Sequence, residues 1–344
     1  MDKCLILTTG RTGSDYLQAC LDNVPGVMTF CGKFAYYKFC SSIKNFDQQD
    51  PEIIFNKFIE KFENIFTYYE LENKKTDLNL IKFKKIFIQE ISKVTLSKKS
   101  FLENLYISYH KTMERNVNDV KVLVHHTHVV DETRKFLSEY PESKMLITIR
   151  DPRANLKSGI VNWFDYDKER IGIDHVFRYL KRVREDLNFA LKTPNKKLFV
   201  KLEEANEIKT KEEICSFLNV KFHENIMIST FASKIWSGDK LSKFKAKKGE
   251  FMNEVKDNKW QDFFNDRDKK ILNLLYKNYS KFGYNIETTN FIDRLLMLLN
   301  SFLPLSFEKK TFNEFKKGYK KVIKNSYIYF KRVLYLYFVI INVR

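Results

Sequence analysis

A loop of small and polar residues near the amino terminus has the chemistry of an anion-binding site. An apolar run ends in the sequence Gly-Arg-Thr-Gly-Ser at positions 10–14, and a helical pattern follows it. Two glycines let backbone N–H groups approach a ligand closely, and the amino end of a helix adds partial positive charge. Arg11 can donate two parallel hydrogen bonds to an anion, while Thr12 and Ser14 supply hydroxyl donors. These residues predict the binding of a phosphate or sulfate group.

The loop does not follow either of the two common nucleotide-binding patterns. A Walker A loop has four residues between its glycines and ends in Gly-Lys-Ser/Thr. Here only Arg11 and Thr12 separate Gly10 from Gly13, and no lysine follows. The dinucleotide fingerprint Gly-x-Gly-x-x-Gly is also absent. An ordinary turn between a strand and a helix is therefore the alternative to an anion-binding loop. Other segments of the chain are needed to choose between these two interpretations.

A second group of anion-binding residues follows the apolar segment 144–149. Arg150 comes directly after this segment, and Pro152 suits the first turn of a helix. Ser158 then lies about two turns further along that helix. Arg150 and Ser158 could bind one phosphate, with Arg153 and Lys157 nearby, whereas an arginine after a strand is more commonly a surface ion-pair residue.

Histidines occur at positions 125, 126 and 128, directly after the apolar segment 120–124. Histidine titrates near neutral pH and therefore suits a general base. On an extended segment His126 and His128 face one way and His125 faces the other, and no further ligand is apparent, so no metal is expected. Burial as hydrogen-bonded core residues is the alternative.

Four apolar segments predict buried strands, and helical patterns separate them. The segments are 4–9, 120–124, 144–149 and 197–201. This alternation predicts an α/β fold with a central parallel sheet and helices on both faces. Ligands of such sheets bind outside the carboxyl ends of the strands. The amino-terminal loop, the histidines and Arg150 should all emerge at that edge.

The chain divides by composition into a main domain over residues 1–290 and a tail over residues 291–344. Within the domain, the mostly helical segment of about 41–119 is longer than an ordinary crossover and is expected to be an insertion. The tail carries eleven Lys or Arg against three Asp or Glu, beside many aromatic and aliphatic residues. It suits an interfacial helix on an anionic membrane, and a helical pair packed on the domain is the alternative.

Length and composition restrict the class of protein. With 344 residues, 44% of them hydrophobic and 15% aromatic, the chain can bury a sizeable core and is expected to fold. The five cysteines are scattered without zinc-binding spacing, which favours a reducing cytoplasm. The net charge of +18 indicates anionic partners. Nucleic acid is not expected, because no helix-turn-helix, zinc-finger or aromatic RNA-binding pattern is present.

The two anion-binding segments together resemble a known family. The sequence Arg-Thr-Gly-Ser-Asp-Tyr at 11–16 is similar to the 5′-phosphosulfate loop of bacterial and carbohydrate-type sulfotransferases that use 3′-phosphoadenosine 5′-phosphosulfate (PAPS). The segment 150–158 is similar to their 3′-phosphate motif, and the order and separation of the two motifs also fit. Segments 201–204 and 247–249 are weaker matches, to the family's Tyr-Glu-Asp-Leu segment and to its carboxy-terminal basic-glycine loop.

The resemblance implies a fold related to P-loop kinases, PAPS as the co-substrate and no metal. Asp15 departs from the Thr or Ser of many relatives, and we expect it to cap the helix. The residues implied to contact PAPS are Arg11, Thr12, Gly13, Ser14, Asp15, Tyr16, Arg150, Ser158, Lys247, Lys248 and Gly249.

The implied reaction is the transfer of a sulfuryl group from PAPS to an acceptor hydroxyl. Arg11 stays protonated and would stabilise charge on the leaving phosphate. The segment 126–128 resembles the family's Lys-Thr-His segment, which implies His128 as the general base, with a carboxylate as the alternative. The acceptor is expected to be a saccharide or a glycolipid. The protein is expected in the cytoplasm, with its tail as a candidate contact to the inner membrane face.

Two other classes of function stay open at this stage. A P-loop-fold kinase with a degenerate loop predicts Mg²⁺-dependent ATP turnover, which the missing loop lysine disfavours. A non-catalytic protein that binds an anionic partner or nucleic acid is the other.

Overall fold

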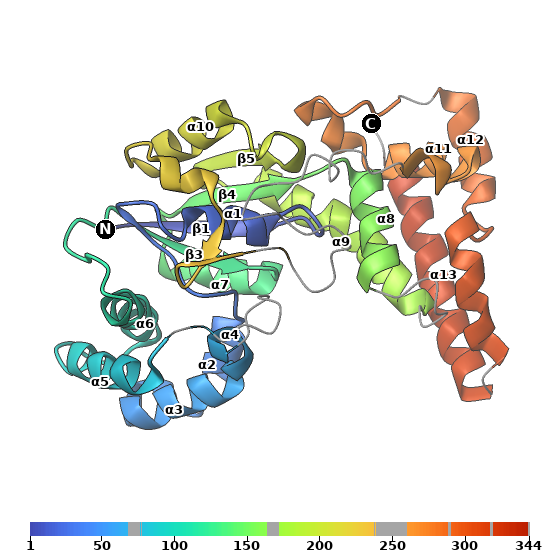
Figure 1. The fold of residues 1–344 in the computed structure, drawn as a ribbon. Coiled ribbons are helices and arrows are strands. Elements are labelled where there is room, and N and C mark those ends of the chain that lie inside the picture. Colours follow the sequence, from blue (N-terminus) through green and yellow to red (C-terminus); the bar gives the residue numbers. More distant parts are fainter. Residues whose placement is uncertain are drawn as a thin grey trace. The chain divides into compact units, whose positions relative to one another are not determined.

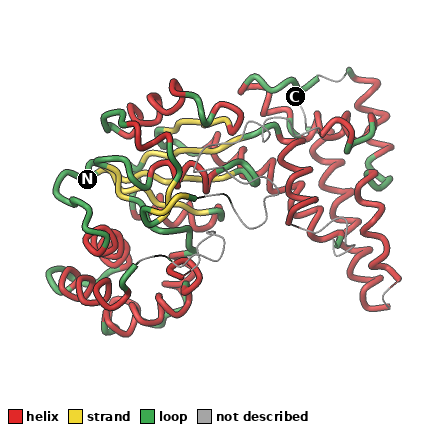
Figure 2. Tube along the Cα trace, viewed as in Figure 1, coloured by secondary structure: helices red, strands yellow, loops and turns green. Residues whose placement is uncertain are grey.

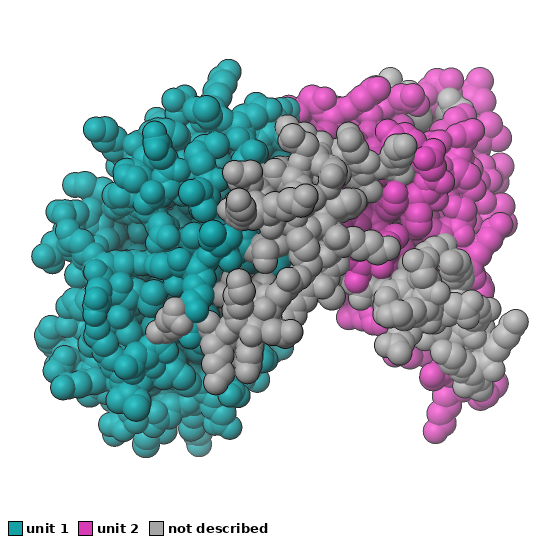
Figure 3. Space-filling view, viewed as in Figure 1, with its two compact units in different colours: residues 1–8, 13–148, 194–255 teal, residues 9–12, 149–193, 256–344 magenta. Residues whose placement is uncertain are grey.

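The computed structural model of the chain describes residues 1–67, 76, 78–163, 172–236, 238, 260–287, 290–316 and 319–342. The chain divides into two compact units, each built from several stretches of sequence (Figure 3). Unit 1 comprises Met1–Thr8, Gly13–Thr148 and Pro194–Val255, and unit 2 comprises Thr9–Thr12, Ile149–Thr193 and Lys256–Arg344. The loop expected to bind an anion thus contributes residues to both units.

A five-stranded parallel sheet with flanking helices forms the centre of the fold (Figures 1 and 2). The strands are β1 (Asp2–Thr8), β2 (Val27–Met28), β3 (Val122–Thr127), β4 (Lys144–Ile149) and β5 (Lys197–Lys201). Their order is β2-β3-β1-β4-β5, and β1 pairs in parallel with both β3 and β4. The predicted α/β fold class is confirmed. Because the strand order reverses direction at β1, its carboxyl end is where such sheets bind ligands.

The strands follow the apolar segments of the sequence, with three differences. β1 begins at Asp2 and ends at Thr8, where the sequence predicts 4–9. β3 begins at Val122 and extends to Thr127, so His125 and His126 lie inside the strand instead of after it. All six β3 residues are buried, because the side chains of both faces pack against other elements. The two-residue strand β2 was not predicted, since a segment this short carries no periodicity.

Unit 1 surrounds the sheet with helices of mostly moderate length. Helices α1 and α7 both contact β1, and α10 contacts β5. The hairpin of β6 (Thr230–Phe231) and β7 (Lys234–Ile235) lies apart from the main sheet. The helices of this unit are α1 (Ser14–Leu21), α2 (Tyr36–Ser41), α3 (Pro51–Lys61), α4 (Glu63–Thr67), α5 (Leu80–Ile91), α6 (Lys98–Thr112), α7 (Val130–Glu139) and α10 (Ile208–Leu218), with 3₁₀ turns η1 (Phe46–Gln48), η3 (Leu202–Glu204) and η4 (Glu224–Met227).

The segment expected as a helical insertion contains α3–α6, which pack around phenylalanines. Phe58 is fully buried, and its ring lies 5.2 Å from that of Phe34 and 6.0 Å from that of Phe66. Phe55 stacks on Phe87 at 4.7 Å. These phenylalanines are therefore core residues of the mostly helical segment that the sequence predicts.

Unit 2 is helical in the part of it that the structure describes. The long helix α13 packs against α9, α11, α12 and the 3₁₀ segment η8, so one face of the tail is docked on the other helices of its unit. The elements are α8 (Pro152–Trp163), α9 (Ile173–Lys192), η6 (Trp260–Asp262), α11 (Asp266–Leu275), η7 (Lys277–Phe282), α12 (Phe291–Asn300), η8 (Ser306–Lys316) and α13 (Tyr319–Ile341).

The five cysteines are free thiols, and all are buried. Burial raises the pKa of the Cys4 thiol to about 12, so this thiol is protonated at neutral pH. Among the described residues, no helix combines the length and the apolar character needed to cross a bilayer.

Candidate active site

The amino end of α1 is shaped by Gly13, which precedes the helix. Gly13 has a φ of +77°, in the left-handed region, and its carbonyl accepts the N–H of Leu17. A Cβ built on Gly13 would lie 2.4 Å from Cδ1 of Leu202. Both the backbone conformation and this close approach require glycine here. Leu202 belongs to the weakly matching segment 201–204, which thus packs directly against the loop.

Ser14 and His128 meet at this helix end. The Ser14 Oγ lies 3.0 Å from Nε2 of His128, and the hydroxyl donates when that nitrogen is unprotonated. His128 follows β3, whose residue Thr127 is paired with Leu7 near the end of β1. The His128 side chain is 19% exposed, so it has access to solvent. The structure therefore brings a hydroxyl and a histidine together at the carboxyl edge of the sheet.

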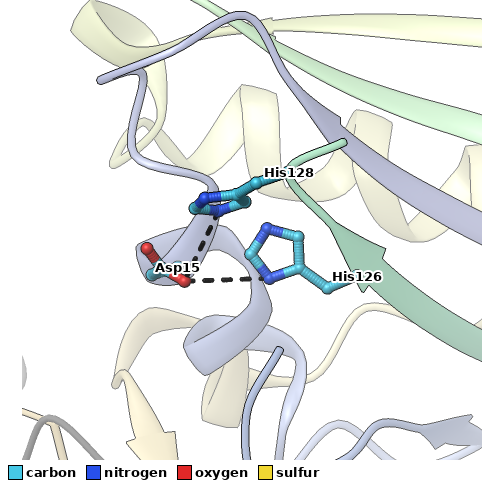
Figure 4. A group of neighbouring side chains, drawn as sticks. All are labelled: Asp15, His126 and His128. Carbon is cyan, nitrogen blue, oxygen red and sulfur yellow. Dashed lines mark ion pairs between the residues drawn. The ribbon is translucent and has the colours of Figure 1, made fainter. Parts of the chain in front are cut away.

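Asp15 joins this pair to a second histidine. Oδ1 of Asp15 lies 3.8 Å from Nε2 of His128 and 3.8 Å from Nδ1 of His126 (Figure 4). Figure 4 shows Asp15 on α1 facing both histidines, which come from β3 and the residues just after it. The sequence indicated that His126 and His128 share a face, and this is confirmed.

Lys33 pairs with the Asp15 carboxylate. Its Nζ lies 2.6 Å and 2.7 Å from the two carboxylate oxygens. Burial alone would raise the pKa of Asp15, but the Lys33 ammonium and the two nearby histidines outweigh it and lower that pKa. Asp15 is thus a carboxylate at neutral pH. The expected capping role is wrong, because Gly13 is the N-cap and no side chain caps the helix.

His126 is held in one tautomer by Gln18. The Gln18 amide nitrogen donates to the carbonyls of Phe30 and Gly32, so its oxygen faces Nδ1 of His126 at 2.6 Å. Burial lowers the pKa of His126 to about 3, so the ring is neutral and Nδ1 carries the proton. Its Nε2 is consequently unprotonated and buried, and no described residue forms a hydrogen bond with it.

Two familiar uses of such residues fit the geometry poorly. In a Ser-His-Asp triad the carboxylate binds the ring nitrogen that does not face the hydroxyl. Here Ser14 and Asp15 both approach Nε2 of His128. Asp15, His126 and His128 place ligand atoms within 4.8 Å of one another, the spacing of a metal group. However, Lys33 already pairs with both oxygens of the carboxylate, and a cation there would have to displace it.

His125 lies on the opposite face of β3, as its position in the sequence predicts. Its Nδ1 is 2.9 Å from the Tyr106 hydroxyl, and its ring stacks on Phe136 with a centroid distance of 5.3 Å. Its side chain is fully buried. His125 is therefore a core residue, the alternative that the sequence left open for these histidines.

Buried histidines should make unit 1 sensitive to acid. Burial lowers the pKa of His110 to about 4 and those of His125 and His126 to about 3. Below pH 6.5 these histidines are protonated in the unfolded chain but stay neutral in the folded unit. The free energy of unfolding therefore falls as the pH drops from 6.5 towards 4. The loss is about 1.4 kcal/mol per histidine for each pH unit in this window. Glu139, whose pKa burial raises, acts in the opposite direction.

Urea unfolding at pH 7.5 and pH 5.5 tests this prediction. We expect the free energy of unfolding to be about 4 kcal/mol lower at pH 5.5, less the opposing contribution of the carboxyl group. The substitution His125→Phe should remove roughly a third of the histidine-dependent loss. Equal unfolding midpoints at the two pH values would contradict the burial of neutral histidines.

In unit 2, Asn155 clamps the loop segment 9–12. The Asn155 Nδ2 donates to the carbonyl of Thr9 at 2.8 Å, and its Oδ1 accepts the backbone N–H of Arg11 at 2.8 Å. The Tyr179 hydroxyl donates to the same Oδ1 at 2.7 Å and also lies 3.1 Å from the Arg11 nitrogen. Sequence reasoning missed both residues, because the contact joins positions 144 apart along the chain.

Two glycines make room for this clamp. A Cβ on Gly10, whose φ is +123°, would lie 2.7 Å from Asn155 Oδ1 and 2.8 Å from the Tyr179 hydroxyl. A Cβ on Gly159 in α8 would lie 2.1 Å from Cε1 of Tyr179 in α9. These positions accept only glycine unless the clamp moves.

The second segment expected to bind an anion begins at the end of β4 and continues into α8. Arg150 and Ser158 are both mostly buried, with 5% and 9% exposure, and the Ser158 Oγ accepts a hydrogen bond from Asn162 at 3.1 Å. The Arg153 side chain bonds within its own segment. Its guanidinium donates two hydrogen bonds to the Asp151 carboxylate, at 3.0 Å and 2.7 Å. Its guanidinium also stacks on Trp260 at 3.9 Å. Arg153 is thus a structural residue.

The comparisons with known proteins give structural neighbours and no sequence match. A sulfotransferase domain from the curacin biosynthetic pathway is 13% identical, covers 83% of this chain and 99% of its own, and has a TM-score of 0.49. A sulfotransferase domain from the olefin synthase of Synechococcus PCC 7002 is 14% identical over 83% of this chain and 96% of its own, with a TM-score of 0.45.

A third neighbour is the sulfotransferase STF9 from Mycobacterium avium, 11% identical over 65% of this chain and 66% of its own, with a TM-score of 0.37. All three neighbours are sulfotransferases or sulfotransferase domains. No model of a protein family and no curated protein sequence matches the chain.

The remaining candidate residues are placed as follows. Tyr16 is buried, and its hydroxyl donates to Asn206 at 3.0 Å while Lys211 lies over its ring. Its side chain is thus part of the packing of unit 1, and a role in ligand binding would rest on its backbone. Thr12 is buried and Arg11 is half-buried. The segment 247–249, with its two lysines and a glycine, lies outside the described residues.

The substitution Asn155→Ala tests the clamp on the loop. It removes the side chain that bonds to the Thr9 carbonyl, the Arg11 N–H and the Tyr179 hydroxyl. We expect the free energy of unfolding to fall by about 2–4 kcal/mol. Amide hydrogen exchange of residues 9–12 should also become faster under native conditions. The matched control Asn188→Ala, in α9 of the same unit, should leave this exchange unchanged; equal protection in both variants would show that Asn155 does not hold the loop.

Proposed function

We propose that this chain is a PAPS-dependent sulfotransferase that moves a sulfuryl group to a hydroxyl of an acceptor. The observation that carries the proposal is the contact between Ser14 and His128, 3.0 Å apart, at the amino end of α1 where β1 and β3 finish. A loop hydroxyl for an anion and a histidine for a proton are the two groups that this reaction needs close together. The resemblance of segments 11–16 and 150–158 to the family's two phosphate motifs supports the same reaction.

The residues have separate tasks in the proposed binding of PAPS. Backbone N–H groups of the turn at Gly13, with the Ser14 hydroxyl, bind the 5′-phosphosulfate, and the left-handed glycine sets the direction of that turn. Arg11 supplies positive charge for the leaving phosphate. Arg150 and Ser158 bind the 3′-phosphate, a pairing of a guanidinium and a hydroxyl that suits a phosphate dianion. Lys247, Lys248 and Gly249 are proposed to contribute further donors.

Bound PAPS supplies an activated sulfuryl group on a good leaving phosphate. His128 accepts the proton of the acceptor hydroxyl as the new bond from its oxygen to sulfur forms and the bond from sulfur to the phosphate oxygen breaks. Before PAPS and the acceptor bind, the Ser14 hydroxyl keeps Nε2 of His128 directed at the loop. The Asp15 carboxylate, 3.8 Å away, stabilises the imidazolium that forms. Lys33 keeps Asp15 ionised for this role.

The acceptor and the site of action are proposed more broadly. We propose a saccharide or a glycolipid as acceptor, in line with the bacterial and carbohydrate-type loop. We place the enzyme in the cytoplasm. No metal has a part in the proposed reaction, because Arg11 and the loop donors supply the positive charge that phosphoryl-transfer enzymes take from Mg²⁺.

Transfer of radiolabel from PAPS to fractionated pools of glycans, lipids and small molecules tests the proposal. We expect labelled product in one pool, formed without added divalent metal. Tight binding of 3′-phosphoadenosine 5′-phosphate with no labelled product in any pool would indicate a protein that only binds the nucleotide. Mg²⁺-dependent turnover of ATP would instead support the kinase alternative.

A further inference from the structure

The exposed side of α13 carries an apolar stripe that its packing does not explain. The stripe consists of Ile323, Tyr327, Phe330, Leu334, Phe338 and Ile341. The exposed fractions of Tyr327, Phe330 and Phe338 are 57%, 58% and 57%. At 100° per residue these six side chains fall within roughly a quarter of the helix circumference. They therefore form one continuous line along the helix.

The opposite side of α13 anchors the helix to its unit. Ile328, Leu336 and Val339 are buried against neighbouring elements, and α13 contacts α9, α11, α12 and η8. The side chains of the apolar stripe are thus not part of the buried core in the described residues of unit 2. Helix α12, which packs against α13, also exposes large apolar side chains, such as Ile292 and Leu299. Exposed apolar surface on this scale marks a place where the molecule binds something.

The charged residues of α13 indicate which kind of partner the apolar stripe binds. The sequence of α13 contains four lysines and one arginine and no acidic residue. Lys320, Lys324 and Lys331 are exposed, and helical geometry puts them along one edge of the apolar stripe. Lys331 also lies 4.3 Å from the ring centroid of Tyr327, at the border between apolar and charged surface. Lysines and tyrosines beside aliphatic side chains are the composition of helices that lie at the interface of an anionic bilayer.

A second copy of the chain is a less favourable occupant. Two such helices face to face would bring lysines together with no acidic side chain on either helix, and like charges at an interface oppose binding. An anionic lipid surface supplies both the apolar phase and the negative charge. We propose that α13 docks the protein on the surface of an anionic membrane, with the apolar stripe in the headgroup region and the lysines on the lipid phosphates. This proposal does not depend on the reaction that the protein catalyses.

Co-sedimentation of the full chain with lipid vesicles tests the proposal. Vesicles of phosphatidylcholine alone are compared with vesicles that also contain phosphatidylserine. Each lysine that reaches an anionic surface strengthens binding roughly fivefold, so we expect much stronger binding to the second vesicles. High salt should weaken this binding, because it screens exposed charges.

Variants separate the apolar contribution from the electrostatic one. The double substitution Phe330→Ser with Phe338→Ser should abolish sedimentation with both vesicles. The double substitution Lys324→Gln with Lys331→Gln should weaken binding to anionic vesicles by roughly 25-fold. The matched control replaces two exposed residues of unit 1, Ile53 and Ile81, with serine, and should bind as the wild type does. Because all of these side chains are exposed, thermal unfolding should be unchanged.

Three outcomes would overturn the proposal. Wild-type protein that stays in solution with anionic vesicles at low salt does not dock on membranes. Stripe variants that sediment as well as the wild type show that another surface binds lipid. A wild-type dimer that the Phe330→Ser, Phe338→Ser variant converts to a monomer, measured by light scattering, assigns the stripe to self-association instead.

Discussion

Replacing His128 with alanine is expected to lower the rate of sulfuryl transfer by about 10²–10⁴-fold while the affinity for 3′-phosphoadenosine 5′-phosphate stays unchanged. His128 lies beside Ser14 and Asp15, with part of its ring open to solvent, so its removal takes away the group that we propose as the proton acceptor. The nucleotide contacts proposed for Arg11, Arg150 and Ser158 involve other side chains. Single-turnover rates and calorimetric titration of the nucleotide measure the two quantities separately.

His126 provides the sharpest control for this experiment, because it lies on the same face of β3 and near the same carboxylate. Its Nδ1 is bound to Gln18, and burial keeps the ring neutral with a pKa of about 3. The substitution His126→Asn retains a donor near that position and should cost far less activity than His128→Ala. Full turnover in the His128→Ala variant would show that the base is elsewhere, as the carboxylate alternative requires. Loss of nucleotide affinity in that variant would show that His128 supports the loop rather than the reaction.

The sequence predicts the elements of this site better than the contacts within it. Strands β4 and β5 have the predicted bounds, and the fold class follows from the alternation of apolar segments with helical patterns. The common face of His126 and His128 also follows, because side chains alternate along any strand. Periodicity and turn chemistry are local properties of the chain, and these features depend on them alone.

The contacts that hold the site residues depend on packing between distant segments. Lys33 lies in an irregular stretch without periodicity, and its pairing with Asp15 appears only once α1 and β2 are placed. Asn155 and Tyr179 are ordinary helix residues until the loop at Arg11 folds against them. Glycines give the one available signal: Gly13 and Gly159 mark places where another side chain approaches the backbone closely.

Arg332 in the tail is another residue whose contacts do not follow from the sequence, which indicates only a basic residue inside an apolar helix. Its side chain is fully buried, and the guanidinium donates to both Glu308 carboxylate oxygens, at 2.9 Å and 2.7 Å. It also donates to the carbonyl of Ser301, and the Leu305 N–H donates to the same carboxylate at 2.7 Å. This cluster joins α13 to η8 and to the end of α12.

Replacing Arg332 with methionine should lower the free energy of unfolding of unit 2 by about 3–5 kcal/mol, because it leaves the Glu308 carboxylate buried and without its cation. The double substitution Arg332→Met with Glu308→Leu removes both charges and should recover most of that loss, since well-packed apolar residues can replace a buried ion pair. The neighbouring exposed residue supplies the control: Lys331→Met should change stability by less than about 0.5 kcal/mol. Denaturant unfolding of the three variants measures these differences. An Arg332→Met loss no larger than that of Lys331→Met would mean that the ion pair adds nothing to the apolar contacts that hold α13 in place.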